Sequence, residues 1–182
     1  MATLPKRVTI HEEGPREGFQ IEPGPISTAR KIEFVDALSE TGLEQIQVAS
    51  FVSPKRVPGW ADAEAVVRGI RRKPGLHYTA LWLNEQGLQR AIACGGLHLE
   101  GGLSTTTSET FMRKNTNRGF AENERVQRAQ IALYRQHGIP VGRVSIMTAF
   151  GCNYEGDISL ARVLEAVESL LRIATDEGVR PG

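Results

Sequence analysis

Short apolar runs alternate along the chain with longer segments in which apolar residues recur every three or four positions. The apolar runs predict five β-strands, at residues 8–13, 45–50, 78–83, 97–101 and 141–149. The periodic segments predict helices at residues 28–41, 61–72, 85–94, 122–137 and 159–177. Gly42 and Gly138 stand where two of these helices are expected to end.

Strict alternation of strand and helix predicts a parallel sheet with right-handed crossovers. Two α/β architectures fit, an open doubly wound sheet and part of a (β/α)8 TIM barrel. A complete barrel takes about 250 residues, and this chain has 182. We therefore expect residues 1–182 to form about the first five βα units of a barrel domain, with the C-terminal strands absent from this chain. The alternative is a half-barrel that pairs with another copy or chain.

The composition narrows the functional classes. Hydrophobic residues make up 40% of the chain and charged residues 24%, which suits a protein with a substantial core. A net charge of +1 favours neither nucleic acid nor an anionic membrane as a partner. The sequence has no apolar run of about 20 residues, the length of a membrane span. Two cysteines without a pairing motif and an N-terminus without an apolar signal core predict a cytoplasmic protein.

In both architectures, functional residues gather in the loops that follow the strands. The loop expected after the first strand carries Arg16 and Glu17 between Gly14 and Gly18. An arginine can stabilise an enolate or a carboxylate, and a glutamate oxygen can bind a hard divalent cation. An ordinary salt bridge on a tight turn is the alternative interpretation of the pair.

The later loops offer weaker candidates. Lys55 and Arg56 could contact the phosphates of a ligand of the coenzyme A type, or could be solvated. The hydroxyl run that ends at Ser108 could bind a polar ligand or cap a helix. Cys152 could be reactive or simply a small buried residue. No two of the four histidines are spaced as a zinc pair, and no nucleotide-binding glycine motif is present.

Five separated segments resemble the hydroxymethylglutaryl-CoA lyase family. Gly14-Pro15-Arg16-Glu17-Gly18-Phe19-Gln20 is similar to the family signature Gly-Pro-Arg-Asp-Gly-Leu-Gln. Further similar segments follow in the same order, at residues 27–43, 50–58, 108–117 and 151–156. The resemblance covers essentially the whole chain and implies a TIM barrel of the metal-dependent lyase superfamily.

The resemblance implies a retro-Claisen cleavage of a 3-hydroxy-3-methylglutaryl-CoA-like thioester to acetyl-CoA and a keto product. By position, Arg16 would be catalytic and would stabilise the enolate, and Glu17 would be a ligand of Mg²⁺ or Mn²⁺. The residues implied around the acyl-CoA substrate are Gln20, Gln47, Ser50, Lys55 and Ser108.

Two departures from the family pattern affect the expected substrate. Glu17 stands where the family has aspartate, and Gln47 stands where it has glutamate. A lyase for another 3-hydroxyacyl-CoA, such as citramalyl-CoA, is therefore an alternative. An aldolase or acyl transferase of the same superfamily and a non-catalytic acyl-CoA-binding half-barrel are the others, and a homo-oligomer is possible. The family's histidine metal ligands and cysteine lid belong to later strands, so Cys152 does not correspond to the lid cysteine.

We predict that the isolated 182-residue chain has no lyase turnover with Mg²⁺ or Mn²⁺, because it holds one of the expected metal ligands. The measurement is acetyl-CoA release from 3-hydroxy-3-methylglutaryl-CoA, with each metal in turn. Sustained release above the rate without protein would contradict the prediction.

Overall fold

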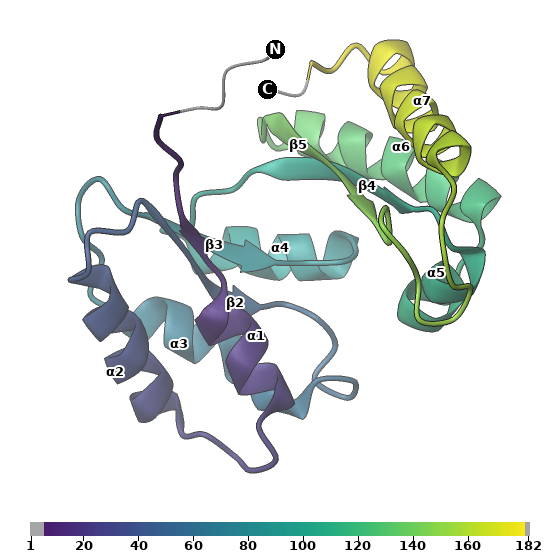
Figure 1. Ribbon diagram of the computed structural model, residues 1–182. Coiled ribbons are helices and arrows are strands. Elements are labelled where there is room, and N and C mark those ends of the chain that lie inside the picture. The colour runs from purple at the N-terminus through teal and green to yellow at the C-terminus, as the bar shows by residue number, and fades with distance from the viewer. Residues whose placement is uncertain (1–5, 181–182) are drawn as a thin grey trace. The chain divides into compact units, whose positions relative to one another are not determined.

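The computed structural model describes residues 6–180, and the chain divides into two compact units, residues 1–99 and 100–182. The first unit contains, in chain order, β1 (His11–Glu12), α1 (Gly14–Ile21), α2 (Thr28–Ser39), β2 (Gln45–Ser50), the short 3₁₀ helix η1 (Pro58–Trp60), α3 (Ala63–Gly69), β3 (His77–Leu81) and α4 (Glu85–Cys94). The second contains β4 (Gly101–Thr106), α5 (Glu109–Thr116), α6 (Phe120–Gln136), β5 (Val141–Met147) and α7 (Leu160–Asp176). Figure 1 shows the helices and strands of both units.

In the first unit, β1, β2 and β3 form a parallel sheet in that order. β2 is its central strand, and all but the first of its residues are buried. Helices α2, α3 and α4 pack side by side in chain order, and α3 lies against β2. The core between these layers is made of Val35, Ile46, Val48, Ala49, Phe51, Trp60, Ala63, Val66, Val67, Ile70, Tyr78, Ala80 and Ala91.

In the second unit, β4 and β5 form a parallel pair that α6 and α7 cover (Figure 1). Leu103 of β4 packs in a small core with Ile131 of α6 and with Leu170 and Ile173 of α7. Arg128 links the two helices, since it pairs with Glu124 of α6 and with Asp176 and Glu177 at the end of α7. These three carboxylates raise the pKa of Arg128 above its usual value.

The parallel α/β class predicted from the alternation is confirmed by every strand pair in residues 6–180. Within these residues the strands pair as three plus two, in separate sheets. A continuous five-strand segment of a barrel therefore stays a prediction. None of the helices in the same residues is long and apolar enough to cross a membrane.

The segment after the first strand was predicted to be a loop, and this is wrong. Residues 14–21 form helix α1, with Pro15 in its first turn. Proline is tolerated there because the first backbone N–H groups of a helix have no partner within the helix. The strand before it is also shorter than the expected 8–13, and Val8 and Ile10 are exposed.

The fourth strand was predicted at residues 97–101, and this is also wrong: β4 begins at Gly101. Gly101, predicted as the last residue of the strand, is its first, and it lies beneath the ring of Tyr134 in α6. A Cβ at Gly101 would lie 2.6 Å from that ring, so only glycine allows the helix to pack so closely. Ser104 to Thr106 are consequently strand residues, and α5, which the sequence analysis did not predict, follows them.

A buried ion pair joins α2 to the segment before α3. Lys31 is 2% exposed, and its ammonium group donates hydrogen bonds to Asp62 at 2.6 Å and to the carbonyl of Gly59 at 2.5 Å. The same group lies 5.0 Å from the centre of the Trp60 ring, in a cation–π contact. Lys31 thereby fixes the short segment that contains η1.

We predict that Lys31→Ala lowers the free energy of unfolding by about 3 kcal/mol, because it removes the partner of a carboxylate that is largely withdrawn from water. Arg30→Ala is the matched control on the same helix. The Arg30–Glu33 pair is 74% and 66% exposed, so its loss should cost less than about 1 kcal/mol. Urea denaturation of both variants measures the difference, and equal costs would contradict the role given to Lys31.

Candidate active site

Arg16 is the centre of a polar cluster that follows the carboxyl end of β1 and reaches the middle of the neighbouring strand β2. Its guanidinium group donates from Nε to the side-chain oxygen of Gln47 in β2. It also donates from Nη2 to Glu13 at 2.5 Å and from Nη1 to Glu17. The side chain of Arg16 is 15% exposed, whereas those of Glu13 and Glu17 are 40% and 53% exposed. A cation that is mostly withdrawn from water is thus held between two partly solvated carboxylates.

The helical conformation of α1 determines which of its side chains lie on the same face. Arg16 and Gln20 are four positions apart, so they lie on the same face of the helix. The carbonyl of Arg16 accepts a hydrogen bond of 3.0 Å from the indole N–H of the buried Trp60. α1 and η1 are also close at Gly59, where a Cβ would lie 2.7 Å from the carbonyl oxygen of Phe19. Both contacts fix the helix against the segment that follows β2.

A β-bulge in β2 brings Gln47 and Ser50 to one face of the sheet. In a regular strand, residues three apart point to opposite faces. Here Val48 is an extra residue, because Gln47 pairs with Thr79 while Ser50 pairs with Leu81. Thr79 and Leu81 share a face, so Gln47 and Ser50 share it as well. The hydroxyl oxygen of Ser50 is buried, and within residues 6–180 it has no hydrogen-bond partner.

Lys55 lies in the loop between β2 and η1, where it is exposed and forms no ion pair within the described part of the chain. The loop itself is fixed from α4. Arg90 donates to both carboxylate oxygens of Glu64, at 2.6 and 2.9 Å, and to the carbonyl of Val52 at 3.4 Å. Its guanidinium group also lies 5.4 Å from the centre of the Phe51 ring. The hydrogen bonds from Arg90 hold the pKa of Glu64 below its usual value.

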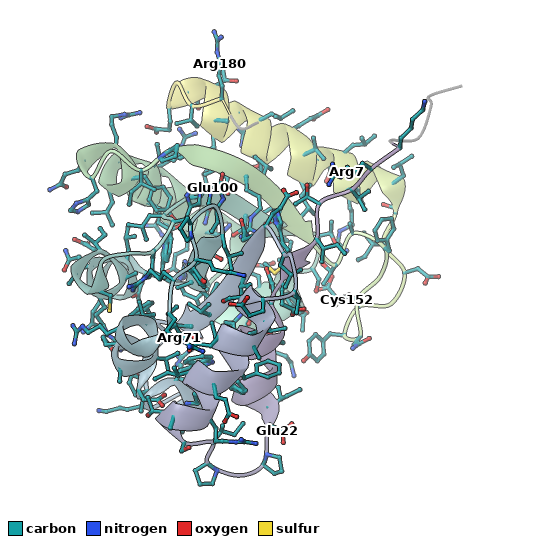
Figure 2. The ribbon with its side chains drawn as sticks, turned by 90° about the vertical axis from the view of Figure 1, so that its left-hand side faces the viewer. Arg7, Glu22, Arg71, Glu100, Cys152 and Arg180 are labelled. Atoms are coloured by element: carbon teal, nitrogen blue, oxygen red, sulfur yellow. The ribbon has the colours of Figure 1, made fainter. Side chains whose placement is uncertain are left out.

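Ser108 belongs to the second unit, residues 100–182. It is buried, and its hydroxyl oxygen caps α5 by accepting from the N–H of Phe111 at 3.0 Å. The thiol of the buried Cys152 donates to the same oxygen at 3.1 Å. Figure 2 shows Cys152 in the loop that follows β5. The Ser108 hydroxyl lowers the pKa of this thiol, an effect that burial opposes.

Glu155 joins this loop to the start of α5. It accepts the backbone N–H of Thr110 at 2.8 Å and pairs with Arg162 of α7 at 3.2 Å. The bonds to Thr110, with those to Ser108 and Arg162, lower the pKa of Glu155 to about 2. The loop and the cap at Ser108 therefore hold each other in place.

A cluster of three threonine hydroxyls lies at the ends of β4 and β5. Thr148 has a φ of 58°, a conformation rare for a β-branched residue, and its hydroxyl bonds to those of Thr106 at 2.6 Å and Thr107 at 2.9 Å. Strained backbone of this kind is typical of functional sites.

The structure thus brings four predicted residues, Arg16, Glu17, Gln20 and Gln47, together around α1 and β2, with Ser50 on the same sheet face as Gln47. Four further residues of the two units were not predicted as functional from the sequence: Glu13, Trp60, Glu155 and Thr148. Glu13 was visible as a carboxylate three positions before Arg16, the spacing of a helical pair. Nothing in the sequence indicates the backbone conformation of Thr148.

Comparisons with known proteins agree on one family. A model of the family described as HMGL-like matches residues 7–177. The chain is 42% identical over 170 residues to the mitochondrial hydroxymethylglutaryl-CoA lyase of Rattus norvegicus, covering 93% of this chain and 51% of that protein. It is 39% identical over 173 residues to the hydroxymethylglutaryl-CoA lyase YngG of Bacillus subtilis, covering 95% and 57%. The chain spans about half the length of these curated relatives.

The solved structures that match this chain are also HMG-CoA lyases. The HMG-CoA lyase of Bacillus subtilis matches with a TM-score of 0.83 at 38% identity, over 93% of this chain and 56% of that one. An HMG-CoA lyase from A. baumannii, in complex with coenzyme A and 3-methylmalate, matches with a TM-score of 0.81 at 31% identity, over 98% and 56%.

We predict that Glu155→Gln destabilises the chain at neutral pH and that the difference shrinks steadily as the pH falls below about 4.5. A carboxylate whose pKa is lowered from 4.5 to about 2 on folding contributes stability above about pH 4.5, and this contribution is lost as the pH falls towards 2. Urea midpoints of the wild type and the variant between pH 7 and pH 3 measure the trend. Glu165→Gln, at an exposed position of α7, is the control, and a pH-independent gap for Glu155→Gln would contradict the prediction.

Proposed function

Since this chain belongs to the HMGL-like family, we propose that it is the part of a carbon–carbon lyase that positions Arg16 for a retro-Claisen cleavage. The substrate is a 3-hydroxy-3-methylglutaryl-CoA-like thioester, and the products are acetyl-CoA and a keto compound. The observation that carries the proposal is the Arg16 guanidinium, which follows the carboxyl end of the parallel strand β1 and is held by Gln47 of the neighbouring strand β2. This is the edge where enzymes of this architecture react.

In the reaction, a base removes the proton of the 3-hydroxyl group, and the bond between C2 and C3 breaks as the new carbonyl forms. The electron pair of that bond passes to the thioester, which becomes the enolate of acetyl-CoA. Arg16 stabilises the negative charge on the enolate oxygen through its N–H groups. A guanidinium group that is 15% exposed is effective in this role, since little water competes for its N–H donors.

Gln20, Gln47 and Ser50 are the proposed contacts of the acyl portion in the first unit, and Ser108 is the proposed contact in the second. Gln20 shares the face of α1 with Arg16, and Ser50 has a buried hydroxyl oxygen without a partner in residues 6–180. Lys55, exposed in the loop after β2, is the proposed contact of the coenzyme A phosphates. The substrate is therefore the proposed partner, and a cytoplasmic homo-oligomer is the proposed form of the enzyme.

Glu17 is the proposed carboxylate ligand of Mg²⁺ or Mn²⁺. Its carboxylate is bound to Arg16, and residues 6–180 contain no group of three or more His, Cys, Asp or Glu side chains that could hold a metal ion. The described residues thus do not form a cation site by themselves, and the roles of Arg16 and Gln47 above do not depend on one.

A second candidate is the cleavage of another 3-hydroxyacyl-CoA, such as citramalyl-CoA. It is favoured by the neutral Gln47 beside Arg16 and by the relative that was solved with coenzyme A and 3-methylmalate. Comparing the affinities of 3-hydroxy-3-methylglutaryl-CoA and citramalyl-CoA distinguishes the two candidates, since the cognate thioester binds more tightly.

We predict that the chain binds 3-hydroxy-3-methylglutaryl-CoA more tightly than acetyl-CoA, because the terminal carboxylate and the hydroxyl group add contacts near Arg16. Arg16→Gln should weaken binding of the first thioester about tenfold, the loss of one charge-assisted pair, and leave acetyl-CoA almost unaffected. Isothermal titration calorimetry measures both affinities. Arg30→Gln, on the exposed side of α2, is the control. Equal affinities of the wild type for the two thioesters would overturn the proposed function.

A further inference from the structure

Glu13 is the partner of Arg16 to which the proposed reaction gives no role. It lies between β1 and α1, and its carboxylate accepts from Nη2 of Arg16 at 2.5 Å. Its carbonyl oxygen accepts the N–H of Glu17 at 2.9 Å, so its backbone is tied to the first turn of α1. Glu13 is therefore fixed from the main chain, while its side chain reaches the guanidinium group.

The three partners of Arg16 differ in charge and in the atom they hold. Gln47 is neutral and binds Nε, so it orients the guanidinium plane without balancing its charge. Glu17 binds Nη1 but is the more exposed of the two carboxylates, and it is the residue that the proposed function assigns to a cation. Glu13 binds Nη2. When Glu17 binds the cation of the proposed function, Glu13 is the carboxylate that still balances the charge of Arg16.

We propose that Glu13 is the positioning residue of Arg16: it holds Nη2 and so directs the Nη1 edge of the guanidinium group to the substrate. A guanidinium group with 15% of its side chain exposed needs a charged partner, because burial of an unpaired cation is unfavourable. Gln47 binds Nε and Glu13 binds Nη2. These two hydrogen bonds together prevent the guanidinium plane from rotating. Glu13 acts through Arg16 and does not contact the reacting atoms. The proposal rests on the proposed function of Arg16.

A double-mutant cycle tests the proposal. In the wild-type background, Glu13→Gln should weaken binding of 3-hydroxy-3-methylglutaryl-CoA about fivefold, as measured by calorimetry. In the Arg16→Gln background the same substitution should change the affinity less than twofold, because residues that act as a unit have non-additive effects. Glu22→Gln is the matched control: it removes the same charge at the exposed end of α1 (Figure 2), away from Arg16. An equal loss in both backgrounds, or no loss in the wild-type background, would overturn the role of Glu13.

A second measurement separates this proposal from the proposed function, because it needs no ligand. The guanidinium protons of Arg16 give nitrogen–proton NMR signals that are identified by their loss in Arg16→Gln. Their exchange with water should be at least threefold faster in Glu13→Gln, unchanged in Glu22→Gln and partly restored in Glu13→Asp. Unchanged exchange in Glu13→Gln would overturn the positioning role, whether or not the chain binds the thioester. If the wild type fails to bind while the exchange responds as expected, the proposed function fails and the fixation of Arg16 by Glu13 stands.

Discussion

The contact between the indole of Trp60 and the backbone of Arg16 fixes helix α1, and α1 carries Arg16, Glu17 and Gln20. Trp60 is fully buried, and its ring also packs against Phe19 at 5.9 Å. From the other direction, the ammonium group of Lys31 binds the carbonyl of Gly59 within the 3₁₀ turn and the carboxylate of Asp62 just after it. The orientation of Arg16 thus depends on the buried Lys31–Asp62 pair, which joins α2 to the segment before α3. Core packing and site geometry are therefore parts of one network.

Three side chains bind the guanidinium group of Arg16, and in the proposed function one of them, Glu17, is free to exchange this contact for another. Gln47 and Glu13 hold two of the guanidinium nitrogens, and Glu17, the most solvated of the partners, holds the third. A retro-Claisen reaction needs a cation that is fixed in place and still has an N–H edge for the enolate. A neutral amide on Nε and a carboxylate on Nη2 meet both requirements, because together they orient the group without covering all of its donors.

The second unit uses similar means to fix Ser108. The hydroxyl group caps α5 and accepts from Cys152. Glu155, in the same loop as Cys152, binds the first turn of α5 through its carboxylate. Cys152 was considered as a reactive thiol or as a small buried residue, and its position fits the second interpretation, since it is buried and bonded to Ser108. The unusual backbone at Thr148 places a third hydroxyl beside Thr106 and Thr107.

The sequence by itself determined the α/β class, the positions of β2 and α4 and the signature around Arg16, because apolar periodicity and short motifs are local properties. It failed at α1, where Gly14-Pro15 looks like a turn but begins a helix. It also failed at β4, where Gly101, predicted as the last residue of the strand, is its first and makes room for Tyr134. Only the tertiary structure decided that Glu13 and Gln47 bind the same guanidinium group and that the bulge at Val48 turns Ser50 to the face of Gln47. These features depend on contacts between distant segments and on strand register, and neither is encoded in the local pattern of residues.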